Sequence, residues 1–224
     1  MFRGDHPDLR RAMYRGLAAA RELGHPRAGS EHLLLALTPT LLERFGVSEA
    51  AVLEAVCRAA PLGAGVAADR DLLAPLGVSV DLTPSIVDRP PAREPLFPLG
   101  AARARRRCAA LTPPLGLDGQ AAYAASLRLA LARCERDHRP EHLALALVAV
   151  DPGAAWVLAA VGTDRSALLS DLAAAYPVPR RNPVLRAERR LTRRSFHRDV
   201  LRRYQHTTGR SPTAPAALSP LITG

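Results

Sequence analysis

Two stretches of the chain carry the same order of sequence signals, and this internal repeat limits the fold more than any other feature. The first contains SEHLLLAL at residues 30–37, and the second contains PEHLALAL at residues 140–147. Each follows a helical pattern that ends near a histidine, His25 or His138. Each also precedes a further helix, a glycine and a capped helix. This shared order indicates two copies of one helical unit.

The apolar residues of both stretches are spaced as in helices. Leu9, Met13 and Leu17 fall on one helical face. The runs at 33–37 and 143–147 are apolar on every side, which is typical of buried helices. Alanine and leucine, which favour helices, are abundant, whereas aromatic residues make up only 4%. We therefore predict an all-α fold: a pseudo-twofold tandem repeat of a four-helix unit, with a proline-rich connector and a basic C-terminal helix.

The same signals divide the chain into four regions. They are a first repeat, a connector rich in proline and arginine that packs on or beside the domain, a second repeat, and an arginine-rich helix with a disordered tail: residues 1–60, 61–118, 119–176 and 177–224. Because proline interrupts helices, we expect only short helices in the connector, near residues 69–74 and 99–110. We expect a basic helix over residues 185–204 and disorder from Thr207, where proline, serine and alanine are frequent.

Residues with known preferences for helix ends predict where several helices begin and stop. We expect the side chains of Ser30, Ser48 and Asp164 to cap helices. Pro140 suits the first position of a helix. Glycine supplies the expected stops after three other helices, at Gly24, Gly46 and Gly162.

The chain contains no lysine, because all 31 of its basic residues are arginine. This excludes the Gly-Lys-Ser/Thr phosphate loop and Schiff-base chemistry. His138 and His142 are four residues apart, as metal ligands on a helix can be, but Pro140 lies between them and disfavours a shared helical face. We therefore predict no catalytic, cofactor-binding or metal-binding site.

The cysteines and the apolar runs suggest a location. Cys57, Cys108 and Cys134 are odd in number and form no CxxC pair, which favours reduced thiols in a cytoplasmic protein. The sequence contains no run of about 18 apolar residues, so we predict no membrane-spanning helix. The first residues also lack the apolar centre of a secretory signal.

The sequence AAARELGHPRAGSEHLLLAL at residues 18–37 resembles the repeat signature of the Clp N-terminal domain, A-x-x-L-G-H-x-x-x-G-T/S-E-H-L-L-L-A-L. The second copy matches through His138, the Glu-His pair at 141–142 and the leucine-rich helix. The resemblance covers about residues 8–60 and 119–176. It implies a compact pseudo-twofold helical domain, which in Clp unfoldases precedes the ATPase rings and receives substrates and adaptors. The AAA+ ATPase modules are absent from this chain.

The two copies differ from each other in length. In the first, 14 positions separate His32 from Gly46, whereas 20 separate His142 from Gly162 in the second. We therefore expect the first copy to lack about two helical turns. With His25 paired to His138, the loop before the second Glu-His pair is expected to be three residues shorter.

The resemblance also implies ligand-binding residues. In some Clp N-domains the glutamate of the Glu-His motif contacts the guanidinium of phosphorylated arginine on substrates. This role corresponds to Glu31 and Glu141, with the neighbouring hydroxyl kept as Ser30 and replaced by Pro140. The alternative is structural, because a glutamate at a helix start is stabilised by the positive end of the helix dipole.

Two functions remain open from the sequence. The leading hypothesis is a non-catalytic module that binds peptides, substrates, adaptors or a Clp unfoldase, with regulation of Clp-dependent proteolysis as one such role. The alternative is nucleic-acid binding, because residues 178–224 carry eleven arginines against two acids, or +9 of the chain's net charge of +10. The candidate polyanion-binding residues are Arg189, Arg190, Arg193, Arg194, Arg202 and Arg203. The oligomeric state stays undetermined.

Overall fold

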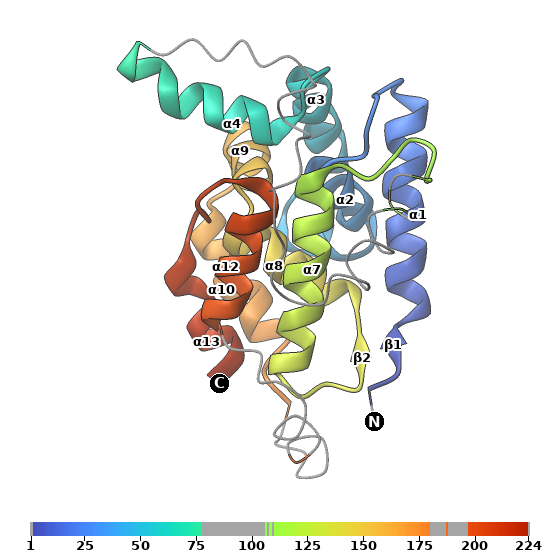
Figure 1. The fold of residues 1–224 in the computed structure, drawn as a ribbon, viewed down its shortest axis with the longest axis vertical. Coiled ribbons are helices and arrows are strands. Elements are labelled where there is room, and N and C mark those ends of the chain that lie inside the picture. The colour runs from blue at the N-terminus through green and yellow to red at the C-terminus, as the bar shows by residue number, and fades with distance from the viewer. Residues whose placement is uncertain are drawn as a thin grey trace.

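The computed structural model describes residues 2–77, 106, 108, 110–179, 187 and 197–223 (Figure 1). Most of these residues are helical, so the prediction of an all-α fold is confirmed. The first helices along the chain are α1 (Pro7–Glu22), α2 (Ser30–Leu37), α3 (Glu49–Ala59) and α4 (Ala64–Leu73). They are followed by α7 (Leu117–Ala132), α8 (Pro140–Val150), α9 (Pro152–Ala160), α10 (Arg165–Ala175), α12 (His197–Thr208) and α13 (Leu218–Thr223). Shorter elements are the π-helix η1 (Thr38–Leu42) and the 3₁₀ turns η2 (Glu43–Phe45), η3 (Ala74–Leu76) and η4 (Pro215–Ala217).

Helices α2 and α8 lie at the centre of the core, with α1 and α7 beside them (Figure 1). Every residue of α2 is buried, and α8 is buried from His142 to Val150. The leucine-rich runs therefore form buried helices, as their sequences predict. In the described ranges no single helix is long and apolar enough to cross a membrane, although two bent pairs, α3 with α4 and η3, and α8 with α9, meet the length and composition together.

Most predicted helix ends are confirmed. Ser48 and Asp164 accept hydrogen bonds from the first turns of α3 and α10, and Gly24, Gly46 and Gly162 have positive φ angles beyond helix ends. Ser30 does not cap α2, however, because Gly29 occupies that position and Ser30 is the first helical residue.

The first residues of two pairs of helices differ by the same number of positions. Helices α1 and α7 both contain 16 residues and begin 110 positions apart, at residues 7 and 117. Helices α2 and α8 also begin 110 positions apart, at residues 30 and 140. The loops before α2 and α8 are therefore equally long. The expected three-residue difference was wrong, because it assumed that His138 takes the place of His25, whereas the shift assigns that place to Glu135.

Parallel backbone pairs join the two halves of the chain. In the short sheet, Asp5 of β1 (Gly4–Asp5) pairs with His138 of β2 (Asp137–His138). An isolated parallel bridge joins Ala28 to Leu115. The shift of 110 relates these pairs, since it carries position 5 to 115 and position 138 to 28. The segment before α1 thus lies beside the segment before α8, and the segment before α7 lies beside the segment before α2.

The two halves differ after their central helices. The chain bends by 84° between α8 and α9, where Asp151 has an extended backbone and Pro152 begins the next helix. After α2, by contrast, Thr38 keeps helical dihedral angles and the chain widens into η1. The first half therefore has a shorter central helix than the second, α2 compared with α8, and a π-helix where the second half has α9.

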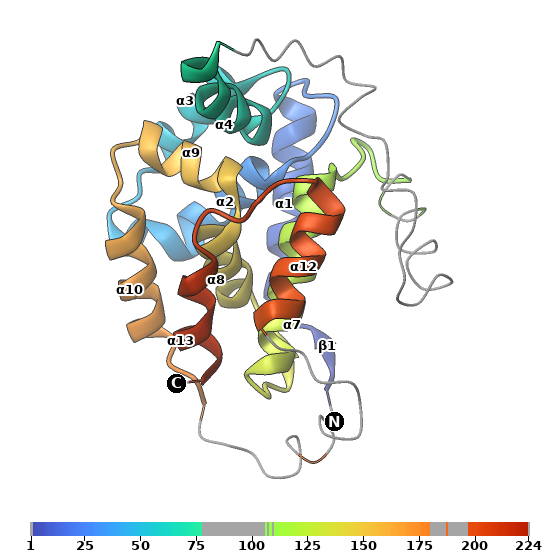
Figure 2. The same cartoon turned by 60° about the vertical axis from the view of Figure 1, so that its left-hand side comes forward.

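The last region packs on the body of the protein. Helix α12 lies beside α7 in both views, and α13 lies close to α7 (Figures 1 and 2). Leu218 and Leu221 are buried, although disorder was expected from Thr207. Their apolar side chains bind this end to the core despite its proline-rich composition. Of the basic helix expected over residues 185–204, the part before position 197 lies outside the described residues, apart from residue 187.

The connector is also partly helical. Helix α4 begins at Ala64, earlier than the short helix expected at 69–74, and packs against α9. It follows Gly63, whose positive φ angle of 91° an L-residue rarely adopts. The helix expected at 99–110 lies almost wholly outside the described residues.

Candidate functional site

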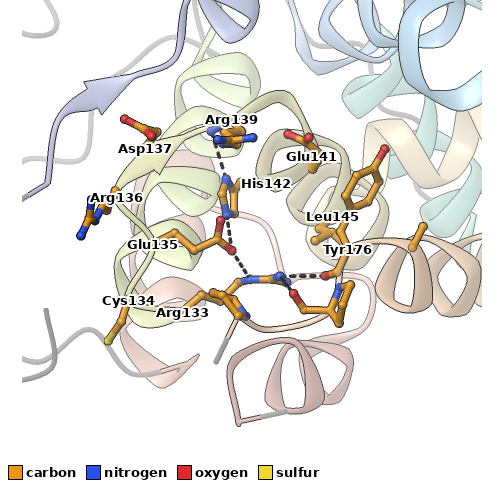
Figure 3. A pocket seen from close by; sticks show the side chains of 13 residues that line it. Arg133, Cys134, Glu135, Arg136, Asp137, Arg139, Glu141, His142, Leu145 and Tyr176 are labelled. Carbon is orange, nitrogen blue, oxygen red and sulfur yellow. Dashed lines mark hydrogen bonds and ion pairs between the residues drawn. The ribbon is translucent and has the colours of Figure 1, made fainter. Parts of the chain in front are cut away.

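A pocket of about 450 Å³ lies at the start of α8 (Figure 3). It is lined by the end of α7, the loop that leads into α8, the first turns of α8 and the end of α10. Arg136 and Arg139 line the pocket and are exposed, so the pocket opens to solvent. Glu141, one of the predicted ligand-binding residues, also lines it.

One wall of the pocket is held in place by hydrogen bonds between Arg133, Glu135 and His142 (Figure 3). Arg133 Nε donates to Glu135 Oε1 at 2.7 Å, and its Nη2 donates to the carbonyls of Tyr176 and Pro177 at 2.7 and 2.8 Å. His142 Nε2 lies 3.0 Å from the same Glu135 oxygen. These contacts join the end of α7 to the start of α8 and the end of α10.

The tautomer of His142 follows from its two contacts. Its Nδ1 accepts the backbone N–H of Arg139 at 3.0 Å, so this nitrogen carries no proton. The proton of the neutral ring is therefore on Nε2 and is donated to Glu135. Burial raises the pKa of Glu135, but the hydrogen bond from His142 and the charge of Arg133 outweigh burial and hold the pKa below its ordinary value.

Glu141 differs from the other acids of the pocket. Its side chain is half-buried, and Oε2 is shielded from solvent without a hydrogen-bond partner among the described residues. In Figure 3 its carboxylate lies apart from the hydrogen-bonded side chains of Arg133, Glu135 and His142. An unpaired buried carboxylate oxygen is costly, and a donor supplied by a ligand would remove that cost.

The predicted ligand-binding residues at the start of α2 lie in the interior instead. Ser30 is fully buried, and Glu31 is only 3% exposed. The Ser30 hydroxyl donates to Asp151 Oδ1 at 2.7 Å, and Glu31 Oε1 lies 3.1 Å from His32 Nδ1. Ser30 and Glu31 therefore do not face solvent, and the structure does not bring them together with Glu141.

Buried acids that the sequence analysis missed surround Glu31. The Asp151 carboxylate caps α9 by accepting the Ala154 N–H at 2.6 Å, and it also accepts the Tyr204 hydroxyl at 2.6 Å. Asp118, at the start of α7, accepts a hydrogen bond from Arg210. Burial raises the pKa of Asp118 to about 6, and the charges of Asp151 and Glu31 add to this rise against the opposing charge of Arg210.

His25, His32 and His138 have structural contacts. His32 Nδ1 accepts the Gly29 N–H at 3.0 Å, and its Nε2 lies 2.8 Å from His25 Nδ1. His138 lies 2.8 Å from Ser126 Oγ and 2.9 Å from Asp5 Oδ1. Within the described residues no group of three or more His, Cys, Asp or Glu side chains could hold a metal ion.

The candidate polyanion-binding arginines are described only in part. Arg202 is exposed on α12, whereas Arg203 is half-buried and its Nε has no hydrogen-bond partner among the described residues. The other four lie outside the described residues: Arg189, Arg190, Arg193 and Arg194.

Comparison with known proteins identifies no relative. No family model matches the chain, and neither a curated protein nor a solved structure matches it.

Proposed function

We propose that the chain is a non-catalytic protein-interaction module that binds a basic side chain of a partner protein in the pocket at Glu141. The observation that carries this proposal is the unpaired, shielded Oε2 of Glu141 in a pocket that opens to solvent. A guanidinium group fits this chemistry because it donates several hydrogen bonds and carries the opposite charge. The exposed Arg136 and Arg139 add positive charge for a phosphate on the same ligand.

We further propose that the architecture is a pseudo-twofold repeat of the Clp N-terminal type. The constant shift of 110 between the starts of the first two helices of each half supports it. So do the two related backbone bridges. The starts of α2 and α8 also share one hydrogen bond. His32 and His142 each accept the backbone N–H of the residue three positions earlier, at 3.0 Å in both cases. The partners expected from this resemblance are a Clp unfoldase, its substrates or its adaptors.

Peptide titration with the full chain tests the site. The probe is a fluorescent peptide with one central arginine, prepared both phosphorylated and unmodified on that side chain. We expect Glu141→Gln to weaken binding by about 10- to 100-fold, since a hydrogen bond to a charged group contributes roughly 1.5–3 kcal/mol. Glu49→Gln is the matched control, because Glu49 is an exposed glutamate in the first turn of α3. Equal affinities of the wild type and E141Q would disprove the site.

The partner class is tested by affinity capture from lysate treated with nuclease. The wild type and E141Q are compared after washes at low and high salt. The proposal expects a Clp unfoldase or a defined set of its substrates to be retained by the wild type and reduced with E141Q.

Nucleic-acid binding is the second candidate function. Arg202 is exposed on α12, two positions from the buried Val200 and Tyr204, so it lies on the outer side of that helix. This candidate predicts that binding to duplex DNA falls steeply with salt and that Arg202→Ala lowers the salt dependence.

A further inference from the structure

The C-terminal segment, residues 197–223, covers a part of the core at Asp151, the acid that also accepts a hydrogen bond from Ser30 at the start of α2. It contributes buried apolar side chains from both of its helices: Val200, Tyr204, Leu218 and Leu221. Helix α12 lies along α7, and the chain then turns toward α13 (Figure 2). The segment also forms polar contacts with separate parts of the fold.

Arg210 and Tyr204 make these polar contacts. Arg210 Nε donates to Asp69 of α4 at 2.5 Å, and its Nη1 donates to Asp118 of α7. The Tyr204 hydroxyl donates to Asp151, the acid that also holds Ser30. One arginine and one tyrosine thus join the segment to α4, α7 and the start of α9.

Arg210 lies near more acidic side chains than one guanidinium could neutralise if all of them were ionised. Asp69 and Asp118 bind it directly, while Glu31 and Asp151 act electrostatically on Asp118. Buried carboxylates without a cation are strongly unfavourable. If the Arg210 side chain were removed, the space between Asp69 and Asp118 would favour another planar cation with several hydrogen-bond donors over a neutral or anionic group.

Glycines leave the space that the guanidinium fills. A Cβ atom at Gly65 would collide with the Asp118 carboxylate and lie 2.7 Å from Arg210 Nη1. A Cβ atom at Gly63 would lie 3.1 Å from Glu31 Oε1. Gly63, just before α4, therefore approaches Glu31, and Gly65, in the first turn of α4, approaches Asp118, so side chains at these positions would narrow the space that the guanidinium fills.

We propose that residues 197–223 form an intramolecular plug, in which the Arg210 guanidinium fills the space between Asp69 and Asp118, and that this plug helps to keep the Glu-His start of α2 closed to external ligands. Among the described residues, the start of α8 lines a pocket that opens to solvent. The closing of a ligand site by the plug rests on the proposed function. The binding of the Arg210 guanidinium between Asp69 and Asp118 does not.

Chemical rescue in the full chain tests the plug. We expect Arg210→Ala to accelerate hydrogen exchange of residues 197–223 by about 100-fold or more relative to α2 and α8, because two hydrogen bonds to carboxylates are lost. Ethylguanidinium at about 10 mM, far below denaturing concentrations, is expected to restore protection, whereas equal ionic strength from sodium chloride is not. Arg202→Ala, on exposed α12, is the matched control and needs no rescue.

Two results would overturn the plug. One is unchanged exchange of residues 197–223 in R210A, and the other is protection that ethylguanidinium fails to restore. If R210A does not fold, Arg210→Lys replaces it, since lysine keeps the charge but cannot bridge two carboxylates as a fork. The plug then predicts faster exchange of residues 197–223 in R210K as well, and unchanged exchange contradicts it. Loss of peptide binding in E141Q with normal rescue in R210A would support both proposals, whereas normal rescue without any peptide binding would leave only the plug.

Discussion

Asp118 gives the protein a stability that falls as the pH rises toward neutrality. Burial raises its folded-state pKa to about 6, against an ordinary value of 3.8. A group whose pKa is raised by folding stabilises the fold fully below the unfolded-state pKa, and this contribution is lost as the pH rises through the folded-state pKa. The ionised form of Asp118 is therefore the unfavourable one in the folded protein, despite its contact with Arg210.

The size of the effect follows from the two pKa values. A difference of about two pKa units corresponds to about 3 kcal/mol, at roughly 1.4 kcal/mol per unit. Because the unfolded-state carboxyl is already largely ionised at about pH 4.5, about 2 kcal/mol of this is lost between about pH 4.5 and pH 8. The side chain is only 18% exposed, so solvent screening reduces this value little.

Urea unfolding of the wild type and Asp118→Asn, across this pH range, measures the effect. The free energy of unfolding of the wild type should fall by about 2 kcal/mol more than that of D118N between about pH 4.5 and pH 8. Below that range Asp5 and Glu135 act in the opposite direction, because their pKa values are lowered in the folded protein and their contribution is lost in acid. Parallel pH curves for the two proteins would refute the electrostatic account of Asp118.

Two further substitutions test the geometry. Cys134→Gly should stabilise the protein by roughly 0.5–1 kcal/mol in thermal unfolding, because Cys134 has a φ angle of 56° that glycine adopts without strain; lower stability would contradict this. Tyr204→Phe should lower the free energy of urea unfolding by about 1.5–3 kcal/mol, since the hydroxyl donates to the buried Asp151 carboxylate. Tyr14→Phe is the control, since Tyr14 is 68% exposed, and an equal loss in both variants would contradict the role of the hydrogen bond.

Much of the helical framework could be predicted because its signals are local. Ser48 and Asp164 cap helices through atoms within three residues of themselves, and Gly46 and Gly162 supply the left-handed stops. The misaligned histidine pair shows where this approach fails. Identical residue type suggested pairing His25 with His138, but the left-handed position after α1 is Gly24, and the residue that matches it after α7 is a cysteine.

The surroundings of Ser30 and Glu31 could not be predicted because segments distant in sequence form them, and Gly63, 32 positions away, lies against the Glu31 carboxylate. Arg210 contacts acids 141 and 92 positions away in sequence, at Asp69 and Asp118. Ser30 contacts Asp151, which is 121 positions away. Nothing in the local Ser-Glu-His pattern distinguishes a helix start that meets such partners from one that faces a pocket.

Differences between α1 and α7 explain why one start is closed and the other open. At equivalent positions, α1 carries the exposed Arg11 and Arg15, whereas α7 carries the buried Ala121 and Ala125. Packing α12 on α1 would bury two charges, so α12 packs on the alanine face of α7 instead. The segment before α7 pairs with Ala28, just ahead of α2, so Asp118 lies near Glu31. A segment that follows α12 therefore reaches Asp118, close to Glu31, whereas among the described residues the start of α8 lines an open pocket.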